Sequence, residues 1–432
     1  MAALREMGGP DVPVSFKTFL QQPGTPEISM QLRCENGQAR IQMSQERFRP
    51  LGSSGAADQT WKVPVYISYA IDGEHRSECI SLNAKSGSFT LSAKGCPGWF
   101  IGNSDEVGYY YTKYEPSALQ TLISNRGQLS LAEQVGLYNE LQNMLAAGRV
   151  QPSQALNLAV QLRDDPRRQI VAAALHLAAV DWHSLPRNLR PRYVAYVEQN
   201  FGPRARKLGW IPKADDNEDD RFIRDPLVPF VVNDGEDAEL IGEAKHLTEE
   251  WLHNRTVLPA DTVRAILSAA ARNGDDALYN KLLARVKNEK DEFFQTALFA
   301  ALGSFRQKEL VEKNLQLLFA GEFDWRVAFG LLTGPQRNPD VAQLPLRFVK
   351  ANYDKVITNL PSGGGTDYGS LLPGTAGAGC SSEAADDAQA FFGGRMEKVN
   401  GGPRALAHAV ESIKLCEARK NAQEPDLVYF FH

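Results

Sequence analysis

The sequence has few cysteines, few histidines and no long apolar run, and each scarcity excludes a class of protein. The five cysteines contain no C-x-x-C pair, which argues against a structural zinc site. The seven histidines contain no H-E-x-x-H motif, so the metalloprotease signature is missing. No stretch approaches the roughly 20 apolar residues that a membrane-spanning helix requires, so no membrane partner is expected.

A surplus of basic charge is also missing. The formal net charge is −5, and because phosphate binding needs clustered Lys and Arg, a nucleic-acid partner is not expected. The 43% hydrophobic content is sufficient for a full core. At roughly 100–200 residues per domain, the chain is expected to form two or three domains. Residues 1–30 lack a signal-peptide pattern, so either the protein is cytoplasmic or its true N-terminus is missing.

Residues 11–115 are predicted to form a small β-sandwich of roughly seven short strands. Residues 16–26 are expected to be a hydrophobic turn that leads into the first strand. Asn36-Gly37 is the dipeptide of a type I′ hairpin turn. This turn places six apolar residues on one face in cross-strand pairs: Met30–Met43, Leu32–Ile41 and Cys34–Ala39. A second hairpin turns at Asp72-Gly73.

From residue 116 the apolar pattern becomes helical. Ser130 and Glu133 form a capping-box signature at the start of a helix that ends near Gly148. Short helices joined by Gly, Asp and Pro turns follow, and beyond residue 260 they resemble the antiparallel pairs of a HEAT-like solenoid. Two stretches are expected to be loops: the acidic 214–220 and the Gly-rich 361–379.

No motif in the chain predicts an active site. His246 and His253 lie seven positions apart on one predicted helix, too far apart to share a metal without a third ligand. The paired aspartates fit helix caps, with Asp275 as an N-cap, and the Gly-rich strings lack the Lys-Ser/Thr of a phosphate loop. A β-domain followed by a helical array is typical of a binding or gating module.

Several stretches in order along the chain resemble one enzyme family. They are "LREMGG" (4–9), "FLQQPGTPEI" (19–28), Asn103 with "GYYYTKY" (108–114), "LSLAEQVGLYNELQNMLAAGRV" (129–150), "LTEEWL", "AAARNGDDALYNKLL", "FFQTALFAALGSF", and finally Cys380, Phe391-Phe392 and "GGPRALAHAVESIKLC". In order and spacing the set is similar to the C-terminal region of M1-family zinc aminopeptidases. Tyr111 occupies a position where that family has Arg.

The resemblance implies three parts: residues 1–10 as the remnant of a preceding catalytic-domain helix, 11–115 as the β-sandwich, and 116–432 as the ERAP1-like helical domain. It implies a bowl of helices that gates the cleft of a peptidase removing N-terminal residues from peptides. The implied partners are a peptide substrate and an M1 catalytic domain, in cis or as a separate chain. The zinc ligands belong to that absent domain, so no cofactor and no activity are expected of this chain alone.

The cysteines at the end of the chain suggest a disulfide. Cys380 and Cys416 flank the terminal helices, and we expect a bridge here, with two buried thiols as the alternative. Cys79 and Cys96, both near strand ends, are a weaker candidate pair, and Cys34 is expected to be a free buried thiol. Disulfides would place the parent protein in the periplasm or outside the cell, and their absence in the cytoplasm.

Basic side chains on the concave helical face are candidates for peptide binding. Arg272, Arg306 and Arg326 could meet a peptide C-terminal carboxylate, although most helix arginines are solvated or paired locally. Two other functions remain open. One is a free-standing, non-catalytic α-solenoid scaffold or peptide- or protein-binding module. The other is an enzyme whose unrecognised site depends on His246 or His253.

Overall fold

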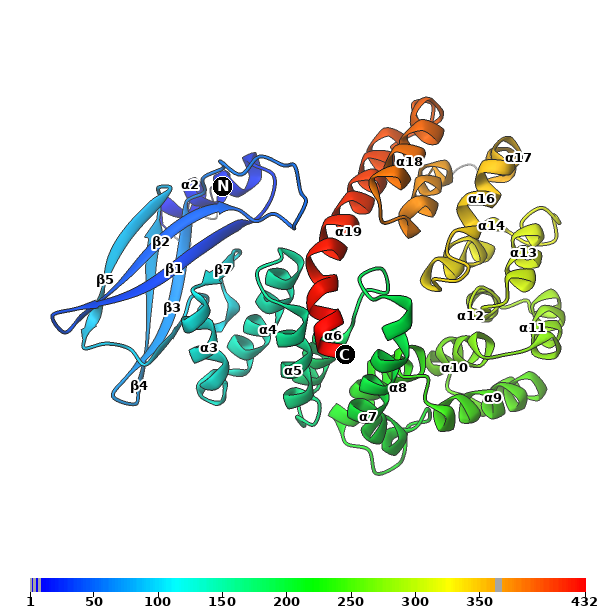
Figure 1. The fold of residues 1–432 in the computed structure, drawn as a ribbon, viewed down its shortest axis with the longest axis horizontal. Helices are drawn as coiled ribbons and strands as arrows, with labels where there is room; N and C mark the ends of the chain where they lie inside the picture. Colours follow the sequence, from blue (N-terminus) through cyan, green and yellow to red (C-terminus); the bar gives the residue numbers. More distant parts are fainter. Residues whose placement is uncertain (1, 3–4, 7–8, 362–366) are drawn as a thin grey trace. The chain divides into compact units, whose positions relative to one another are not determined.

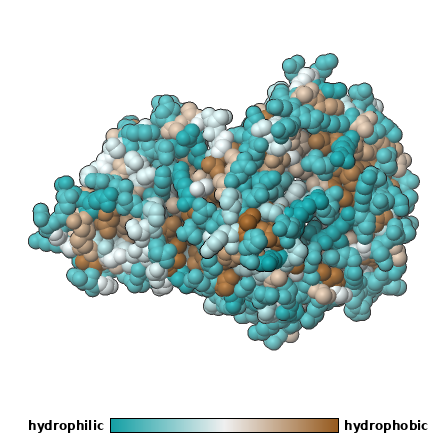
Figure 2. Space-filling model, viewed as in Figure 1, coloured by the Kyte–Doolittle hydropathy of each residue, from teal (hydrophilic) through white to brown (hydrophobic). Residues whose placement is uncertain are grey.

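The computed structural model describes residues 2, 5–6, 9–361 and 367–432, and the chain divides into two compact units, 1–151 and 152–432 (Figure 1). Half of the predicted remnant at 1–10 lies outside the described residues, namely 1, 3–4 and 7–8. A β region is followed by an all-α region, as the sequence predicts. No helix in the described part of the chain is both long and apolar enough to cross a bilayer. On the face shown in Figure 2, most of the surface is hydrophilic and apolar residues form small, separated groups.

The strands of the first unit form two sheets, with the orders β5-β2-β1-β7 and β4-β3-β6. The strands are β1 (Pro26–Glu35), β2 (Gln38–Arg47), β3 (Val63–Ile71), β4 (Glu74–Leu82), β5 (Ser86–Lys94), β6 (Trp99–Ile101) and β7 (Tyr111–Tyr114). The predicted register of the first hairpin is confirmed at all three pairs. Asn36 (φ 52°) and Gly37 (φ 75°) both adopt the left-handed conformation that a type I′ turn needs.

Helix α2 (Asp11–Gln21) stands where the sequence analysis expects a turn. Asp11 lies in its first turn, where a negative charge suits the helix dipole. The helix buries none of its residues, and Phe16 and Leu20 remain 46% and 64% exposed. Local sequence, rather than burial of an apolar face, therefore accounts for this helix.

Helices α3 (Pro116–Ser124) and α4 (Leu131–Ala146) belong to the first unit because they contact its strands, α3 against β6 and β7 and α4 against β7. The predicted capping box is present: Ser130 Oγ accepts from Glu133 N, and the Glu133 carboxylate accepts from Ser130 N. Secondary structure therefore changes near residue 115, whereas the compact units divide at 151.

The second unit consists of helices whose neighbours in sequence pack together, such as α5 on α6, α7 on α8, and α18 on α19. The longer helices are α5 (Pro152–Leu162), α6 (Arg168–Ala178), α7 (Arg190–Leu208), α8 (Glu218–Asp234), α9 (Ala238–His253), α10 (Ala260–Arg272), α11 (Asp276–Asn288), α12 (Glu292–Leu302), α13 (Lys308–Leu317), α16 (Leu344–Ala351), α17 (Tyr353–Asn359), α18 (Ser382–Met396) and α19 (Gly402–Phe431). Shorter elements are α14 (Trp325–Ala328), α15 (Gly330–Thr333), and the 3₁₀ turns η3 (Arg187–Leu189), η4 (Arg255–Val257), η5 (Gly334–Arg337) and η6 (Tyr368–Ala378).

The last helix of this unit returns to its first. Asp426 of α19 accepts hydrogen bonds from Ser153 N (2.7 Å) and Ser153 Oγ (2.9 Å) at the start of α5. Arg192 of α7 donates to Phe431 O at 2.8 Å. These contacts join the two ends of the helical unit, as the position of α19 in Figure 1 also shows.

Two predicted loops are partly helical. Helix α8 begins inside the acidic stretch 214–220, with Asn217 as its N-cap, and Asp216 forms an ion pair with the buried Arg224. Pro226 and Pro229 lie inside α8. Because interior prolines disfavour a helix, the sequence alone does not predict one here. In the stretch 361–379, residues 362–366 lie outside the described part, and 368–378 form η6, which buries Leu372 and Thr375.

Candidate functional site

Helix α10 carries a polar stripe on one face. Asp261, Arg264, Ser268 and Arg272 follow i, i+3, i+7 and i+11 spacing, which aligns them along the helix. The opposite face is fully buried through residues such as Val263 and Ile266. Because the buried apolar face anchors α10 in the helical unit, the orientation of the polar stripe is fixed as well.

This stripe lines a hollow of about 590 Å³, which we call the arginine groove. Its charged groups belong to Arg264, Arg272, Arg337, Asp234 and Asp261, and Asn338 is among its polar residues. Small residues line much of the rest, and two of them are required by packing. A Cβ atom on Gly303 would lie 2.7 Å from Gly330 O, and one on Gly334 would lie 2.6 Å from Gly303 O.

Arg272 is a half-buried cation of the groove. Its Nη2 donates to Asn233 O at 3.3 Å, whereas its buried Nε has no hydrogen-bond partner among the described residues. Burial, followed by the neighbouring Arg306 charge, lowers the pKa of the Arg272 guanidinium to about 10, against the opposing attraction of Asp234 and Glu236. Burial also raises the pKa of the Asp234 carboxyl above its usual value, while Arg272 and the Tyr193 hydroxyl oppose that rise.

The three arginines proposed from sequence do not form one set. Arg272 lines the groove, and Arg306 lies close enough to affect its pKa but pairs with Glu236 at 2.9 Å. Arg326 is exposed and pairs at 3.2 Å with Asp324, the N-cap of its own helix α14, which is the locally paired alternative. Sequence reasoning missed Arg264, Arg337 and Asn338. The spacing of Arg264 and Arg272 on α10 was a usable signal, but nothing local linked them to Arg337.

A second hollow, of about 790 Å³, adjoins the arginine groove, since Thr333 and Arg337 line both. We call it the tryptophan hollow because Trp182 and Phe329 supply its aromatic surface. The Trp182 ring stacks on the His183 ring with centroids 3.6 Å apart. The helical unit thus offers a basic surface that continues into an aromatic one.

The cysteine pairing differs in part from the expectation. The structure bridges Cys380 to Cys416 (Cα–Cα 5.2 Å) and Cys34 to Cys96 (Cα–Cα 5.8 Å), and leaves Cys79 as an exposed free thiol. The predicted Cys79–Cys96 pair and the free Cys34 are therefore wrong. The path of the chain explains the Cys34–Cys96 pairing. Gly95 N donates a hydrogen bond to Gly37 O at 2.8 Å, and this contact holds Cys96 beside the first hairpin turn.

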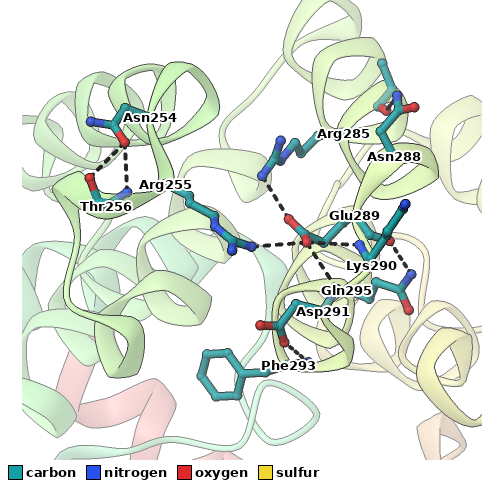
Figure 3. Close-up of polar contacts among 11 residues, drawn as sticks. Asn254, Arg255, Thr256, Arg285, Asn288, Glu289, Lys290, Asp291, Phe293 and Gln295 are labelled. Carbon is teal, nitrogen blue, oxygen red and sulfur yellow. Dashed lines mark hydrogen bonds and ion pairs between the residues drawn. The ribbon is translucent and has the colours of Figure 1, made fainter.

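A buried carboxylate organises the turn between α11 and α12, as Figure 3 shows. Glu289, with only 5% of its side chain exposed, accepts from Arg285 at 2.8 Å and from Arg255 at 3.3 Å. The backbone nitrogens of Lys290 and Asp291 also donate to it. All of these partners belong to the protein itself, so this network is structural.

The two histidines considered as metal ligands do not converge. His246 lies 3.6 Å from Glu250, and His253 Nδ1 lies 2.7 Å from Glu249 O; both are exposed on α9. Each pairs within its own helix, so the structure offers no support for a site built on them.

Known proteins resemble this chain over most of its length. Residues 99–415 match the family model described as ERAP1-like C-terminal domain. The chain is similar to aminopeptidase M1-C of Oryza sativa subsp. japonica (24% identity over 82% of this chain) and to mitochondrial aminopeptidase 2 of Saccharomyces cerevisiae (22% over 95%). It is also similar to human endoplasmic reticulum aminopeptidase 2 (23% over 77%). It spans only 41%, 42% and 35% of the length of these three relatives.

Proposed function

Because this chain belongs to the ERAP1-like C-terminal domain family, we propose that it is the peptide-binding, substrate-gating portion of a zinc metallo-aminopeptidase. The relatives are named aminopeptidases, which supports removal of N-terminal residues from peptides as the reaction. The chain spans less than half the length of these relatives, which supports a separate catalytic part. The sequence has no H-E-x-x-H, so the zinc and the activated water would belong to that part. This chain would bind and orient the peptide.

The arginine groove is the observation that carries this proposal. Arg264 and Arg337 line the groove together with the half-buried Arg272, and guanidinium groups pair with carboxylates through charge-assisted hydrogen bonds. The small side chains lining the groove would let an extended backbone approach closely. The bound group in this proposal is the C-terminal carboxylate of the peptide, and the aromatic tryptophan hollow would receive apolar side chains.

Peptide binding tests the proposal. Fluorescence anisotropy would compare a labelled peptide bearing a free C-terminal carboxylate with its C-terminally amidated twin. We expect the amidated peptide to bind about tenfold more weakly, a loss of about 1.4 kcal/mol. Arg264→Ala and Arg337→Ala should weaken the free-carboxylate peptide similarly and leave the amidated one unchanged, with the locally paired Arg326→Ala as the matched control.

Equal affinity for the two peptides would contradict a carboxylate site. It would favour instead a free-standing module that binds internal peptide segments or folded partners.

The absence of activity is a separate part of the proposal. The purified chain with added Zn²⁺ should release no fluorophore from aminoacyl-coumarin amides. When an M1 catalytic domain is added, all zinc ligands should belong to that domain and none to this chain. Metal-dependent turnover by the chain alone, abolished by His246→Ala or His253→Ala, would replace this view with that of an unrecognised enzyme.

The proposed partner surface for the catalytic domain lies on the first unit. Four apolar side chains of α2 are exposed (Val12, Val14, Phe16 and Leu20), and the Phe19 ring contacts the 70%-exposed Tyr109 at a centroid distance of 6.1 Å. Exposed apolar groups gathered in this way are typical of an interface. The two disulfides in turn support a periplasmic or secreted location, because such bridges persist in oxidising compartments.

A further inference from the structure

One cluster of metal-ligating side chains lies outside the arginine groove. A ring nitrogen of His183 and the sulfur atoms of Cys380 and Cys416 all lie within 4.8 Å of one another. The three residues come from different parts of the helical unit: the segment after α6, the junction between η6 and α18, and the middle of α19. The structure holds the two sulfur atoms as a disulfide.

We propose that these three residues bind one Zn²⁺ when the bridge is opened to two thiols, so that the same cluster serves as a disulfide or as a metal site. Two thiolates and one imidazole are ligands that zinc prefers, and a three-ligand site leaves a fourth position open. Both His183 and Cys416 line the tryptophan hollow. The open position would therefore face that hollow, and the ion and a small reductant can enter through it.

The surroundings of His183 already have the form of a metal-binding histidine. Its Nδ1 lies 2.9 Å from Asp181 Oδ1, and Arg419 pairs with the other oxygen of the same carboxylate. A carboxylate on one ring nitrogen fixes the ring and directs the other nitrogen to the metal.

The second ring nitrogen can be released at small cost. His183 Nε2 lies 3.1 Å from Ala378 O, the carbonyl two residues before Cys380. Gln343 Nε2 donates to the same carbonyl at 2.9 Å. When Nε2 turns to a metal, Ala378 O therefore keeps a hydrogen-bond donor, and no buried carbonyl is left without one.

The chemistry balances with a dithiol as reductant. The dithiol gives two electrons and two protons to the Cys380–Cys416 bond, which breaks into two thiols while the dithiol closes to a cyclic disulfide. Zn²⁺ then displaces one proton from each thiol to the buffer. Two thiolates cancel the charge of the ion, and the Arg419 charge is already paired with Asp181, so the occupied site carries no net charge.

Cobalt titration tests this site directly. The chain would carry Cys34→Ser, Cys79→Ser and Cys96→Ser, so that Cys380 and Cys416 are its only thiols. After reduction with dithiothreitol and its removal by gel filtration under argon, Co²⁺ should bind once, with sulfur-to-cobalt charge-transfer and tetrahedral d–d absorption. Zn²⁺ should displace it. Circular dichroism before and after reduction checks that the fold is kept.

The variants separate a built site from loose thiol binding. His183→Gln should weaken Co²⁺ binding at least tenfold, Asp181→Asn should weaken it about tenfold to a hundredfold, and His246→Ala should leave it unchanged. The unreduced chain should bind no Co²⁺ with these bands. The proposal is overturned if the reduced chain lacks the bands. It is also overturned if His183→Gln binds Co²⁺ as tightly as its parent, because thiols of an unfolded chain would give that same result.

Discussion

At the residue scale, the first unit contains a group of carboxyls that we expect to link pH to stability. Glu106 follows Asp105, and both have positive φ. The carboxyl of Glu106 lies against Gly136 of α4, where a Cβ atom would collide with it. Burial of this carboxyl, followed by the charge of Glu133, raises the Glu106 pKa to about 7. Glu140 is buried nearby, accepts from Thr112 N at 2.7 Å, and has a pKa raised by burial.

Glu106→Gln should change how stability depends on pH. Because the folded state holds the proton to a higher pH than the unfolded state, whose pKa is near 4.5, the wild-type free energy of unfolding should fall as pH rises from 4.5 to 7. Since part of the side chain is exposed, we expect a loss of only about 1–2 kcal/mol over this window. Urea titrations at several pH values should show a flatter profile in the variant. A profile as steep as wild type would contradict this assignment.

A second residue prediction concerns Glu289. Its removal in Glu289→Ala leaves Arg285 without its ion-pair partner and two backbone nitrogens without their acceptor. We expect the free energy of unfolding to fall by about 2–4 kcal/mol. Glu292→Ala, three residues further along the chain in the first turn of α12, is the control. It should lower the free energy of unfolding by less than about 0.5 kcal/mol. Urea unfolding measures both, and an equal loss in the two variants would refute the role of the network.

At the element scale, α19 is tied to α5 by a carboxylate at a helix N-terminus. Asp426 accepts from Ser153 N, one of the backbone donors that the first turn of α5 leaves unpaired. Elements that lie far apart in sequence can be joined in this way only in the folded unit. The pattern of α19 predicts a helix, but not the partner of its acidic residue.

Asp426→Ala should loosen the C-terminal end of α19. The lost cap and hydrogen bonds should cost about 1–2 kcal/mol, and limited proteolysis should cut the C-terminal segment faster. Glu411→Ala, an exposed residue on the same helix, should behave like wild type. Unchanged cleavage rates in Asp426→Ala would mean that the aromatic contacts of Phe431 hold this end instead.

At the scale of the whole molecule, Phe16 and Leu20 of α2 should contribute little to the stability of the chain, since the helix buries none of its residues. The double variant Phe16→Asp and Leu20→Asp should therefore keep the thermal stability of the chain. It should weaken association with a separately expressed M1 catalytic domain at least tenfold, as measured by biolayer interferometry. Tyr429→Asp, which alters an 85%-exposed residue, is the control and should bind normally. Binding unaffected by the double variant would exclude α2 from the interface.

The sequence by itself determined most of the elements and their order, although it predicted a turn where α2 lies and loops where α8 begins and η6 lies. Asn36-Gly37 defined a hairpin and its register, Ser130 with Glu133 defined a helix start, and periodicity located most helices, because these features depend on neighbours within a few residues. Where prolines interrupt a helix, as in α8, the same local reasoning failed.

Only the tertiary structure decided which distant residues meet. It joined Cys96 to Cys34 rather than to Cys79, placed Arg337 beside Arg264 and Arg272, left Arg326 apart, and brought His183 to Cys380 and Cys416. These meetings depend on how buried faces pack across segments remote in sequence, and a local pattern carries no information about the partner that such packing selects.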